Sequence, residues 1–186
     1  MSNALRLQAI LSADPLRWRV LDLVRSLHLP DCWVGAGFVR NAVWDHLHER
    51  PSSGLTGDVD VVWFDSRRSD RSVDERLETE LAEMDSGVEW SVKNQARMHL
   101  RNGDGPYGSV LDAMRFWPET ATAIAVRRTE QGGFEIAAPF GLDDLFGLIL
   151  RPTPGFVSGK HGIFQDRVRE KAWLSRWPRI RLEGAG

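Results

Sequence analysis

Cysteine is almost absent from this sequence: Cys32 is the only one among 186 residues. A single thiol excludes a disulfide within the chain and a zinc site built from cysteines. Because Cys32 begins the apolar segment Cys32-Trp33-Val34, we expect it to be a buried structural thiol. This cysteine usage is typical of a reducing compartment.

Long hydrophobic runs are also missing. The fully apolar stretches span only a few residues, such as Leu148-Ile149-Leu150, whereas a membrane-spanning helix needs about 20. Residues 1–11 lack the apolar segment and the cleavage site of a signal peptide, so we expect a cytoplasmic protein with no membrane partner. Neither sign of charge dominates, because the formal net charge is −2, and charge alone therefore gives no indication of nucleic-acid binding.

The composition is that of a globular chain. Hydrophobic residues make up 42% and charged residues 27% of the sequence, which argues against disorder. The length suits one domain with its own core, and no internal repeat divides the sequence. We therefore expect residues 1–186 to form a single domain, with N-terminal helices over 3–27 and a C-terminal helix over 161–176 as additions.

Helical and strand patterns alternate along the chain. Leu16, Val20, Leu21 and Val24 recur at helical spacing behind Asp14-Pro15, a capping residue followed by a proline suited to the first helical turn. Helices are expected over residues 3–12, 15–27, 38–47, 70–83, 93–100, 109–115 and 161–176, strands over 32–34, 58–64, 88–92, 120–128 and 134–138, and a short helix or turn over 142–150. This mixture predicts an α/β or α+β fold with a central mixed sheet flanked by helices.

Two acidic residues, Asp58 and Asp60, begin an apolar strand. Side chains two positions apart on a strand point to the same face, roughly 6.6 Å apart along it. Like charges at that spacing repel each other unless a cation lies between them, and Mg²⁺ binds to one or two carboxylates together with substrate phosphates. The same pattern also occurs on an edge strand that faces water, so this pair alone is a weak signal.

A small-residue turn, Gly35-Ala36-Gly37, lies between an expected strand and an expected helix. Small residues let the backbone approach a ligand, and the N–H groups at the start of a helix bind anions. Arg40 follows one helical turn later and is able to contact a phosphate. The alternative is a tight turn with an exposed arginine. A dinucleotide-binding fingerprint fits less well, because Arg40 stands where that pattern needs a small residue.

Taken together, these two segments resemble a known signature. Residues 34–41 (Val-Gly-Ala-Gly-Phe-Val-Arg-Asn) followed by residues 57–61 (Gly-Asp-Val-Asp-Val) are similar to the polymerase-beta-type nucleotidyltransferase superfamily, and most similar to the tRNA CCA-adding enzymes. The sequence departs from their pattern where Ala36-Gly37 replaces a glycine pair and where Asn41 replaces an aspartate. The spacer before Asp58 is also longer, and the expected loop over residues 50–57 accommodates it.

Other segments resemble a bacterial nucleotidyltransferase-like family of unassigned substrate. The similar segments are Val92 to His99, Trp117 to Ala123, Ala138 to Phe146, and Arg167 to Pro178. The likeness covers roughly residues 30–178. It implies the family more strongly than it implies a particular reaction.

The resemblance implies transfer of a nucleoside monophosphate from a nucleoside triphosphate to a hydroxyl acceptor, with release of pyrophosphate. Asp58 and Asp60 would hold Mg²⁺, and the triphosphate would bind against Gly35, Ala36, Gly37 and Arg40. The superfamily uses a third carboxylate on the next strand, for which Glu89 is the candidate; an exposed strand glutamate with no role is the alternative.

The polar segment Lys93 to His99 also resembles the family. Lys93, Asn94 and Arg97 are candidate nucleotide contacts on a pocket wall, whereas the alternative is a capped helix in which Asn94 binds the backbone. Arg167 and Lys171, four apart, fit either a solvated helix face or a phosphate contact. The acceptor stays open between a small molecule, a protein and an RNA. A non-catalytic nucleotide-binding or regulatory protein on the same fold is the rival interpretation.

Overall fold

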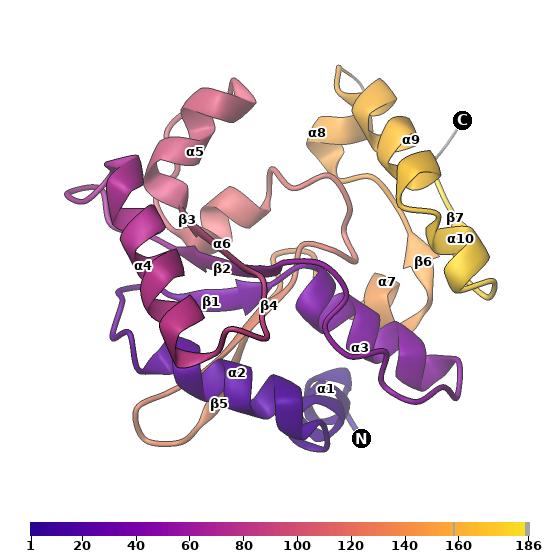
Figure 1. The fold of residues 1–186 in the computed structure, drawn as a ribbon. Coiled ribbons are helices and arrows are strands. Elements are labelled where there is room, and N and C mark those ends of the chain that lie inside the picture. The colour runs from indigo at the N-terminus through magenta and orange to yellow at the C-terminus, as the bar shows by residue number, and fades with distance from the viewer. Residues whose placement is uncertain (158, 185–186) are drawn as a thin grey trace.

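The computed structural model describes residues 1–157 and 159–184, in which helices and strands alternate (Figure 1). The helices are α1 (Asn3–Ser12), α2 (Pro15–Arg25), α3 (Gly37–Leu47), α4 (Arg71–Met84), α5 (Gln95–Asn102), α6 (Val110–Met114), α7 (Asp143–Phe146), α8 (Pro154–Val157), α9 (His161–Glu170) and α10 (Trp173–Arg176). The strands are β1 (Trp33–Gly35), β2 (Val59–Trp63), β3 (Trp90–Asn94), β4 (Ala125–Arg128), β5 (Phe134–Ala137), β6 (Ile149–Leu150) and β7 (Arg181–Leu182).

A five-stranded sheet forms the centre of the molecule, in the order β3-β2-β1-β4-β5. β2 and β3 are parallel, whereas β1 is antiparallel to both of its neighbours, β2 and β4, and β4 and β5 form an antiparallel hairpin. The sheet is therefore mixed, which confirms the predicted fold class. β6 and β7 form a separate parallel pair.

The two faces of the sheet have different surroundings. On β2, Val59, Val61 and Trp63 point into the main core with α1, α2, α3 and α4, and each is 1% exposed or less. The alternate residue Val62 lies on the other face, in a smaller apolar cluster with α6. Because side chains alternate along a strand, Asp60 shares the face of Val62 and is kept out of the main core.

The central helix α3 connects the sheet to the C-terminal part of the chain. Trp44 on α3 is fully buried, and its ring packs edge-on against Trp173 and Trp177, at centroid distances of 6.3 and 5.2 Å. Phe164 of α9 belongs to the same core cluster as Leu7 of α1. The two end segments thus share one apolar core with the sheet.

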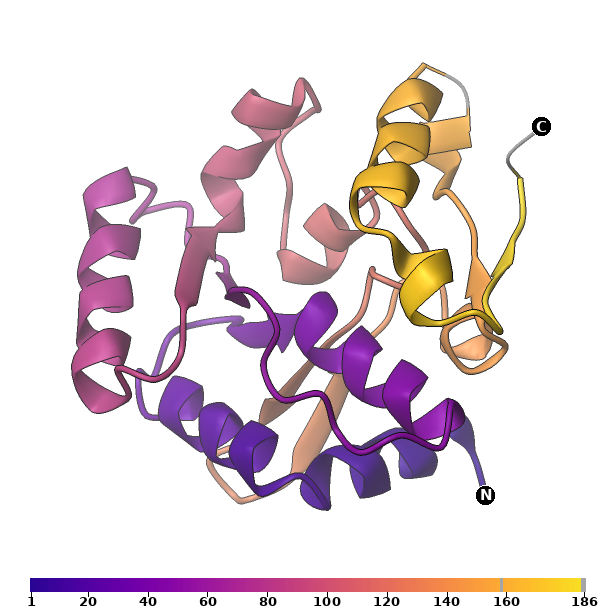
Figure 2. The same ribbon diagram turned by 45° about the vertical axis from the view of Figure 1, so that its right-hand side comes forward.

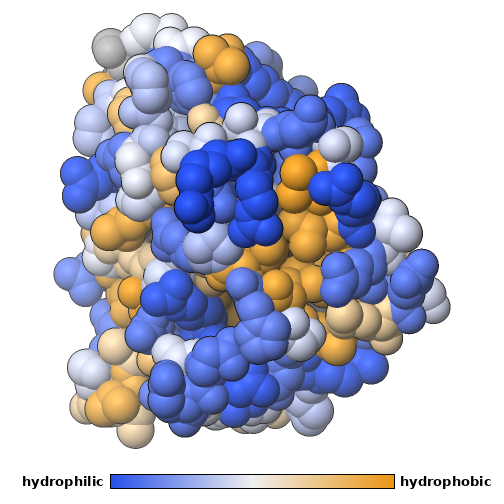
Figure 3. All heavy atoms as spheres, turned by 90° about the vertical axis from the view of Figure 1, so that its left-hand side faces the viewer, coloured by the Kyte–Doolittle hydropathy of each residue, from blue (hydrophilic) through white to orange (hydrophobic). Residues whose placement is uncertain are grey.

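Local signals account for several helix boundaries. The Asp14 side chain accepts a hydrogen bond from the Arg17 backbone N–H at 3.1 Å, and Pro15 occupies the first turn of α2, as predicted. α4 carries many charges on its outer side, and the side of the molecule on which α4 lies is mostly hydrophilic, with several hydrophobic areas among the polar side chains (Figure 3). None of the described helices has both the length and the apolar character needed to cross a bilayer.

The structure differs from the expected elements in several places. Lys93 and Asn94 belong to β3 instead of beginning the expected helix over 93–100, and residues 149–150 form the short strand β6. Strand β4 begins at Ala125, because residues 120–124 form a turn in which the Ala123 N–H donates to the Glu119 carbonyl. The predicted continuous helix over 161–176 is broken at Ala172, which adopts a left-handed conformation with φ 48°. The break turns α10 back toward α3, so that Trp173 reaches the core.

Candidate functional site

A cleft of about 660 Å³ lies on the face of the sheet opposite the main core. Its floor is formed by β2, β3 and the turn before α3. One wall comes from α5 and the other from α9 and α10, which stand on opposite sides above the sheet (Figure 2). The cleft joins segments that are more than a hundred residues apart in sequence, including both halves of the predicted signature.

Asp58 and Asp60 both line this cleft. Asp58 directly precedes β2 and is exposed, whereas Asp60 lies inside the strand and is largely buried. Within the described residues, no side chain forms an ion pair or a hydrogen bond with either carboxylate. Burial and the neighbouring charge of Asp58 raise the pKa of Asp60 to about 6. Two adjacent carboxylates without a partner are a donor set suited to a divalent cation.

The turn before α3 faces the same cleft. Ala36 and Gly37 line it, and Ala36 has φ 54° and ψ −124°, a backbone region that a residue with a Cβ rarely adopts. The Ala36 N–H donates to the Ile124 carbonyl at 2.9 Å, which fixes the turn against the start of β4. The first turn of α3, whose N–H groups have no partners within the helix, therefore begins beside the cleft.

Gly35 has a different role from the one predicted. It does not line the cleft, and a Cβ at this position would lie 2.9 Å from the Ile124 carbonyl oxygen and 3.2 Å from the Trp117 ring. Glycine is needed here because β4 and Trp117 approach the backbone closely. Gly35 therefore allows the start of β4 and Trp117 to pack closely against the beginning of the turn.

Arg40 reaches the cleft from α3, although it is only 7% exposed. Its guanidinium packs against both the Trp44 and the Trp173 rings, at 5.2 and 4.6 Å from their centroids. Nη1 donates to Thr122 and Nη2 to Asn41, both at 2.9 Å, while Nε has no hydrogen-bond partner among the described residues. Burial lowers the pKa of Arg40 to about 10, so the side chain is a fixed cation at neutral pH.

The C-terminal wall of the cleft is basic. Arg167 donates from Nε to Glu119 Oε1 at 2.7 Å, and Glu119 is fully buried. Basic side chains that line the cleft outnumber the acidic ones: they are Arg40, Lys93, Arg101, Arg167, Lys171 and Arg176, against Asp58 and Asp60. A cleft with this charge distribution attracts polyanions, although the chain as a whole is slightly acidic.

Besides Gly35, three predicted site residues are not brought to the cleft. Glu89 precedes β3 as an exposed residue, and the strand partner of Asp60 is instead Ser91. Asn94 is fully buried and caps α5 by accepting from the Ala96 N–H at 3.0 Å, which is the alternative that the sequence left open. Arg97 forms an ion pair with buried Asp74 on α4. Lys93, by contrast, does line the cleft.

Sequence reasoning missed several cleft residues. Ser91, Thr122 and Arg176 line the cleft, although the sequence did not single them out as site residues. Thr122 and Arg176 lie in segments that resemble the family, and that likeness and the spacing of Arg167 and Lys171 were the available signals. Arg176 follows the break at Ala172, which the sequence pattern did not indicate.

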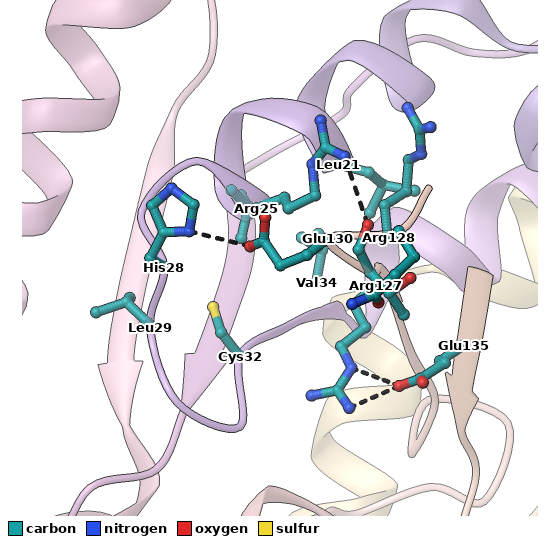
Figure 4. Close-up of a pocket in the computed structure, with 13 residues that line it drawn as sticks. Leu21, Arg25, His28, Leu29, Cys32, Val34, Arg127, Arg128, Glu130 and Glu135 are labelled. Atoms are coloured by element: carbon teal, nitrogen blue, oxygen red, sulfur yellow. Dashed lines mark hydrogen bonds and ion pairs between the residues drawn. The ribbon is translucent and has the colours of Figure 1, made fainter. Parts of the chain in front are cut away.

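A second cavity, of about 430 Å³, lies at the other end of β1, between α2 and the β4–β5 hairpin (Figure 4). Its floor contains Cys32, which is buried as predicted, and burial raises the pKa of this thiol to about 12. Polar side chains around this cavity bind one another: His28 contacts Glu130 at 3.0 Å and Arg127 donates to Glu135 at 2.7 Å (Figure 4). We therefore place the candidate site in the first cleft.

The fold and the cleft define a class of protein. The sheet is mixed, and an acidic pair at the start of β2 lies in one cleft with a glycine-containing turn that leads into α3. This is the arrangement of polymerase-beta-type nucleotidyltransferases. The sequence model of the nucleotidyltransferase family matches residues 22–182, and the chain therefore belongs to that family.

Solved structures agree with this assignment. A structure determined by NMR and described as a CCA-adding enzyme head domain is 33% identical, has a TM-score of 0.83, and matches over 95% of both chains. A CCA-adding enzyme in complex with CTP is 16% identical, with a TM-score of 0.61 and coverage of 95% of this chain but 43% of that one. The Thermotoga maritima CCA-adding enzyme complexed with tRNA is 16% identical, with a TM-score of 0.60 and coverage of 95% and 42%.

These two enzymes share the fold with this chain, which spans less than half of their length. A comparison with curated proteins finds no significant match. The family and the fold are thus established, whereas the substrates have to be argued from the cleft.

Proposed function

We propose that this protein transfers a nucleoside monophosphate from a nucleoside triphosphate to a hydroxyl acceptor, in a reaction that depends on Mg²⁺ and releases pyrophosphate. The observation that carries the proposal is the position of Asp58 and Asp60 in one cleft with the Ala36-Gly37 turn and Arg40. An acidic pair for a metal and a turn for phosphates are the two parts that such a transfer requires.

Asp58 and Asp60 are the proposed metal ligands. They fit a divalent cation because both carboxylates lie in the cleft, and the raised pKa of Asp60 reflects burial and, after it, repulsion from Asp58, which a cation would relieve. In such sites Mg²⁺ supplies neutralisation of the charge that develops on the phosphates. In the described residues no group of three or more histidine, cysteine or acidic side chains has the geometry of a metal site, so phosphate oxygens and water would complete the coordination.

The triphosphate would bind along the turn. The free N–H groups at the start of α3 are donors for phosphate oxygens, and Gly37 leaves room for close approach, because a Cβ there would meet only the Arg40 and Asn41 side chains at 3.5 Å or more. Arg40 adds a buried cation that is oriented by Thr122 and Asn41 before any ligand arrives. Lys93 and the basic side chains of the C-terminal wall would orient the rest of the nucleoside triphosphate and the acceptor.

The acceptor hydroxyl would attack the α-phosphorus from the side of the cleft that faces Asp58 and Asp60. A small molecule, a protein and an RNA all remain candidate acceptors. Because matching structures were solved with CTP and with tRNA, we would test CTP and an RNA 3′ hydroxyl first. We also propose that residues 1–186 form one domain with the terminal helices as additions, and a cytoplasmic location remains a prediction from the sequence.

A non-catalytic nucleotide-binding protein is the second candidate. The specific observation that favours it is Ser91, which occupies the position beside Asp60 on the next strand, where the superfamily places a third carboxylate. With two carboxylates instead of three, the cleft would bind a metal–nucleotide complex but promote transfer poorly.

Pyrophosphate release separates the two candidates. We would incubate the protein with each nucleoside triphosphate, Mg²⁺ and a panel of hydroxyl acceptors, and repeat the assay with Asp58→Asn. Asp70→Asn is a matched control, because Asp70 is an exposed aspartate that caps α4 outside the cleft. Release that requires Mg²⁺ and is lost only in Asp58→Asn supports transfer, whereas nucleotide binding without release for every acceptor supports the non-catalytic protein.

A further inference from the structure

We infer that Asp45, on α3, is a positioning residue that links the C-terminal wall of the cleft to the loop that carries Asp58. This inference rests on the proposed function, because it concerns the same metal site. Asp45 does not line the cleft itself. It acts through its contacts with the loop over residues 50–57, here called the α3–β2 loop, which leads directly into Asp58.

The Asp45 carboxylate joins two distant segments. Its Oδ2 accepts hydrogen bonds from both the backbone N–H, at 3.0 Å, and the hydroxyl of Ser53 in the α3–β2 loop. Its Oδ1 accepts from Trp177 Nε1 at 2.8 Å, immediately after α10. Asp45 is 3% exposed and Trp177 is 1% exposed, so the bond between them is shielded from water, whereas Ser53 lies at the surface.

The α3–β2 loop has no regular secondary structure, yet both of its ends are tied down. Arg17, 1% exposed, donates to the Ser52 hydroxyl at 2.6 Å and to the Gly54 carbonyl at 2.8 Å. Near the cleft, the Thr56 hydroxyl accepts from Asn41 and from Arg176, both at 3.2 Å. Such a loop has few conformations available, and its direction at Asp58 is therefore set by these contacts.

The chemistry of the junction calls for a carboxylate. Within the described residues, Asp45 forms no ion pair and accepts hydrogen bonds only from neutral donors. Burying a carboxylate without a cation beside it costs free energy, so a contact with a purely structural role would favour a neutral side chain. This junction, however, needs acceptors on both sides. Only a carboxylate supplies them, because an asparagine would present N–H donors to either Ser53 or Trp177.

Asp45→Asn is therefore a sharp test. The variant keeps the volume but has one acceptor oxygen instead of two, so either Ser53 or Trp177 must face an N–H donor. In both orientations the connection between the α3–β2 loop and Trp177 is broken, which should release the loop. Ser53→Ala removes only the hydroxyl contact, at an exposed position, and so tests the loop with little risk to folding. In both variants hydrogen exchange at the backbone amide of residue 53, which donates to Asp45 Oδ2 in the unaltered protein, should become faster without any metal present.

The decisive readout is Mn²⁺ binding, followed by electron paramagnetic resonance in the full-length protein. We expect Asp45→Asn to weaken Mn²⁺ binding roughly tenfold or more, which is typical when a residue that orients a metal ligand is lost. Ser53→Ala should weaken it less, in the same direction. The Mg²⁺ concentration for half-maximal activity should rise by a similar factor.

Asp74→Asn is the matched control. Asp74 is also a buried aspartate on a helix that accepts from a tryptophan, Trp63 Nε1, at 2.8 Å and from a backbone N–H, that of Asn94, but it lies behind β3 rather than beside the α3–β2 loop. It should destabilise the fold while leaving Mn²⁺ affinity unchanged. If Asp74→Asn and Asp45→Asn weaken Mn²⁺ binding equally, the effect is general destabilisation and the inference is wrong.

A further variant separates this inference from the proposed function. Asp58→Asn should abolish Mn²⁺ binding. If it does so while Asp45→Asn and Ser53→Ala bind Mn²⁺ like the unaltered protein, the inference fails and the proposed function stands. If Asp58→Asn leaves Mn²⁺ binding intact, or the unaltered protein binds no Mn²⁺, the proposed metal site is wrong, and the inference about Asp45 is wrong with it.

Discussion

Asp60 on β2 and Ser91 on β3 are register partners in the parallel pair at the edge of the sheet. The residue beside the proposed metal ligand on the next strand is therefore a hydroxyl, while the acidic Glu89 lies two positions earlier, outside the cleft. This relationship determines which acidic side chains take part in metal binding, and it leads to the first prediction.

Glu89→Gln should leave metal-dependent activity within about twofold of the unaltered protein, because the exposed side chain does not line the cleft. Ser91→Asp should tighten Mn²⁺ binding, since it adds a carboxylate beside Asp60. Titration of Mn²⁺ into each variant measures both effects. A large loss of activity in Glu89→Gln would mean that β3 shifts when the substrates bind.

Ala36→Gly should stabilise the protein. Ala36 adopts φ 54° and ψ −124°, which strains a residue that carries a Cβ by roughly 1–3 kcal/mol, whereas glycine adopts it freely at a smaller entropic cost. We expect a net gain of about 1 kcal/mol, or roughly 2–4 °C in Tm for a chain of this size. The opposite change should follow Ala9→Gly, at an exposed position inside α1, which serves as the control in thermal unfolding.

Asp60 should lower the stability of the metal-free protein at neutral pH. Its pKa is raised to about 6 in the folded state, above the ordinary value of 3.8, so the folded protein holds this proton more tightly than the unfolded chain. The folded state is therefore favoured at pH below about 4, and that advantage is lost as the pH rises toward 6. The loss is roughly 3 kcal/mol for a shift of this size.

Asp60→Asn removes this titration. In EDTA, its free energy of unfolding should exceed that of the unaltered protein by a margin that grows between pH 4 and pH 7, while Mn²⁺ binding is lost. Urea unfolding at several pH values measures the margin. A margin that stays constant with pH would contradict the burial of an ionisable group at this position.

Cys32 should react slowly with alkylating reagents. Burial raises the pKa of its thiol to about 12, so the reactive thiolate is scarce at pH 8, roughly a thousandfold scarcer than for a free cysteine. Iodoacetamide labelling followed by mass spectrometry should therefore become fast only when denaturant is added. Rapid labelling of the folded protein would mean that the cavity beside β1 opens to solvent.

Local patterns were sufficient to predict much of the fold. The individual strands and helices, the Asp14-Pro15 start of α2 and the short β1–turn–α3 unit each depend on residues that are near one another in sequence, whereas the strand order depends on distant pairs such as Val34 and Val126. The grouping of Asp58 and Asp60 was likewise predictable, because alternation along a strand places them on one face. Their position opposite Ala36-Gly37 was implied by the resemblance to a known signature.

The remaining site residues depend on contacts between distant segments. The sequence pattern predicts Arg97 as a phosphate ligand, but its guanidinium forms an ion pair with Asp74, 23 residues earlier. Asn94 satisfies buried carbonyls of the β2–α4 connection, those of Asp65 and Arg68, both at 2.9 Å. No periodicity in the sequence reveals such pairings, and the same applies to the left-handed Ala172 that brings α10 to the cleft.

The central claim is tested most directly by a crystal structure with Mg²⁺ and a nucleoside triphosphate whose α,β-bridging oxygen is replaced by a methylene group. The account predicts a metal ion bound by Asp58 and Asp60, with the phosphates against the Ala36-Gly37 turn and Arg40. A nucleotide bound elsewhere, for example in the cavity beside Cys32, or phosphates in the cleft with no metal at the aspartates, would contradict it.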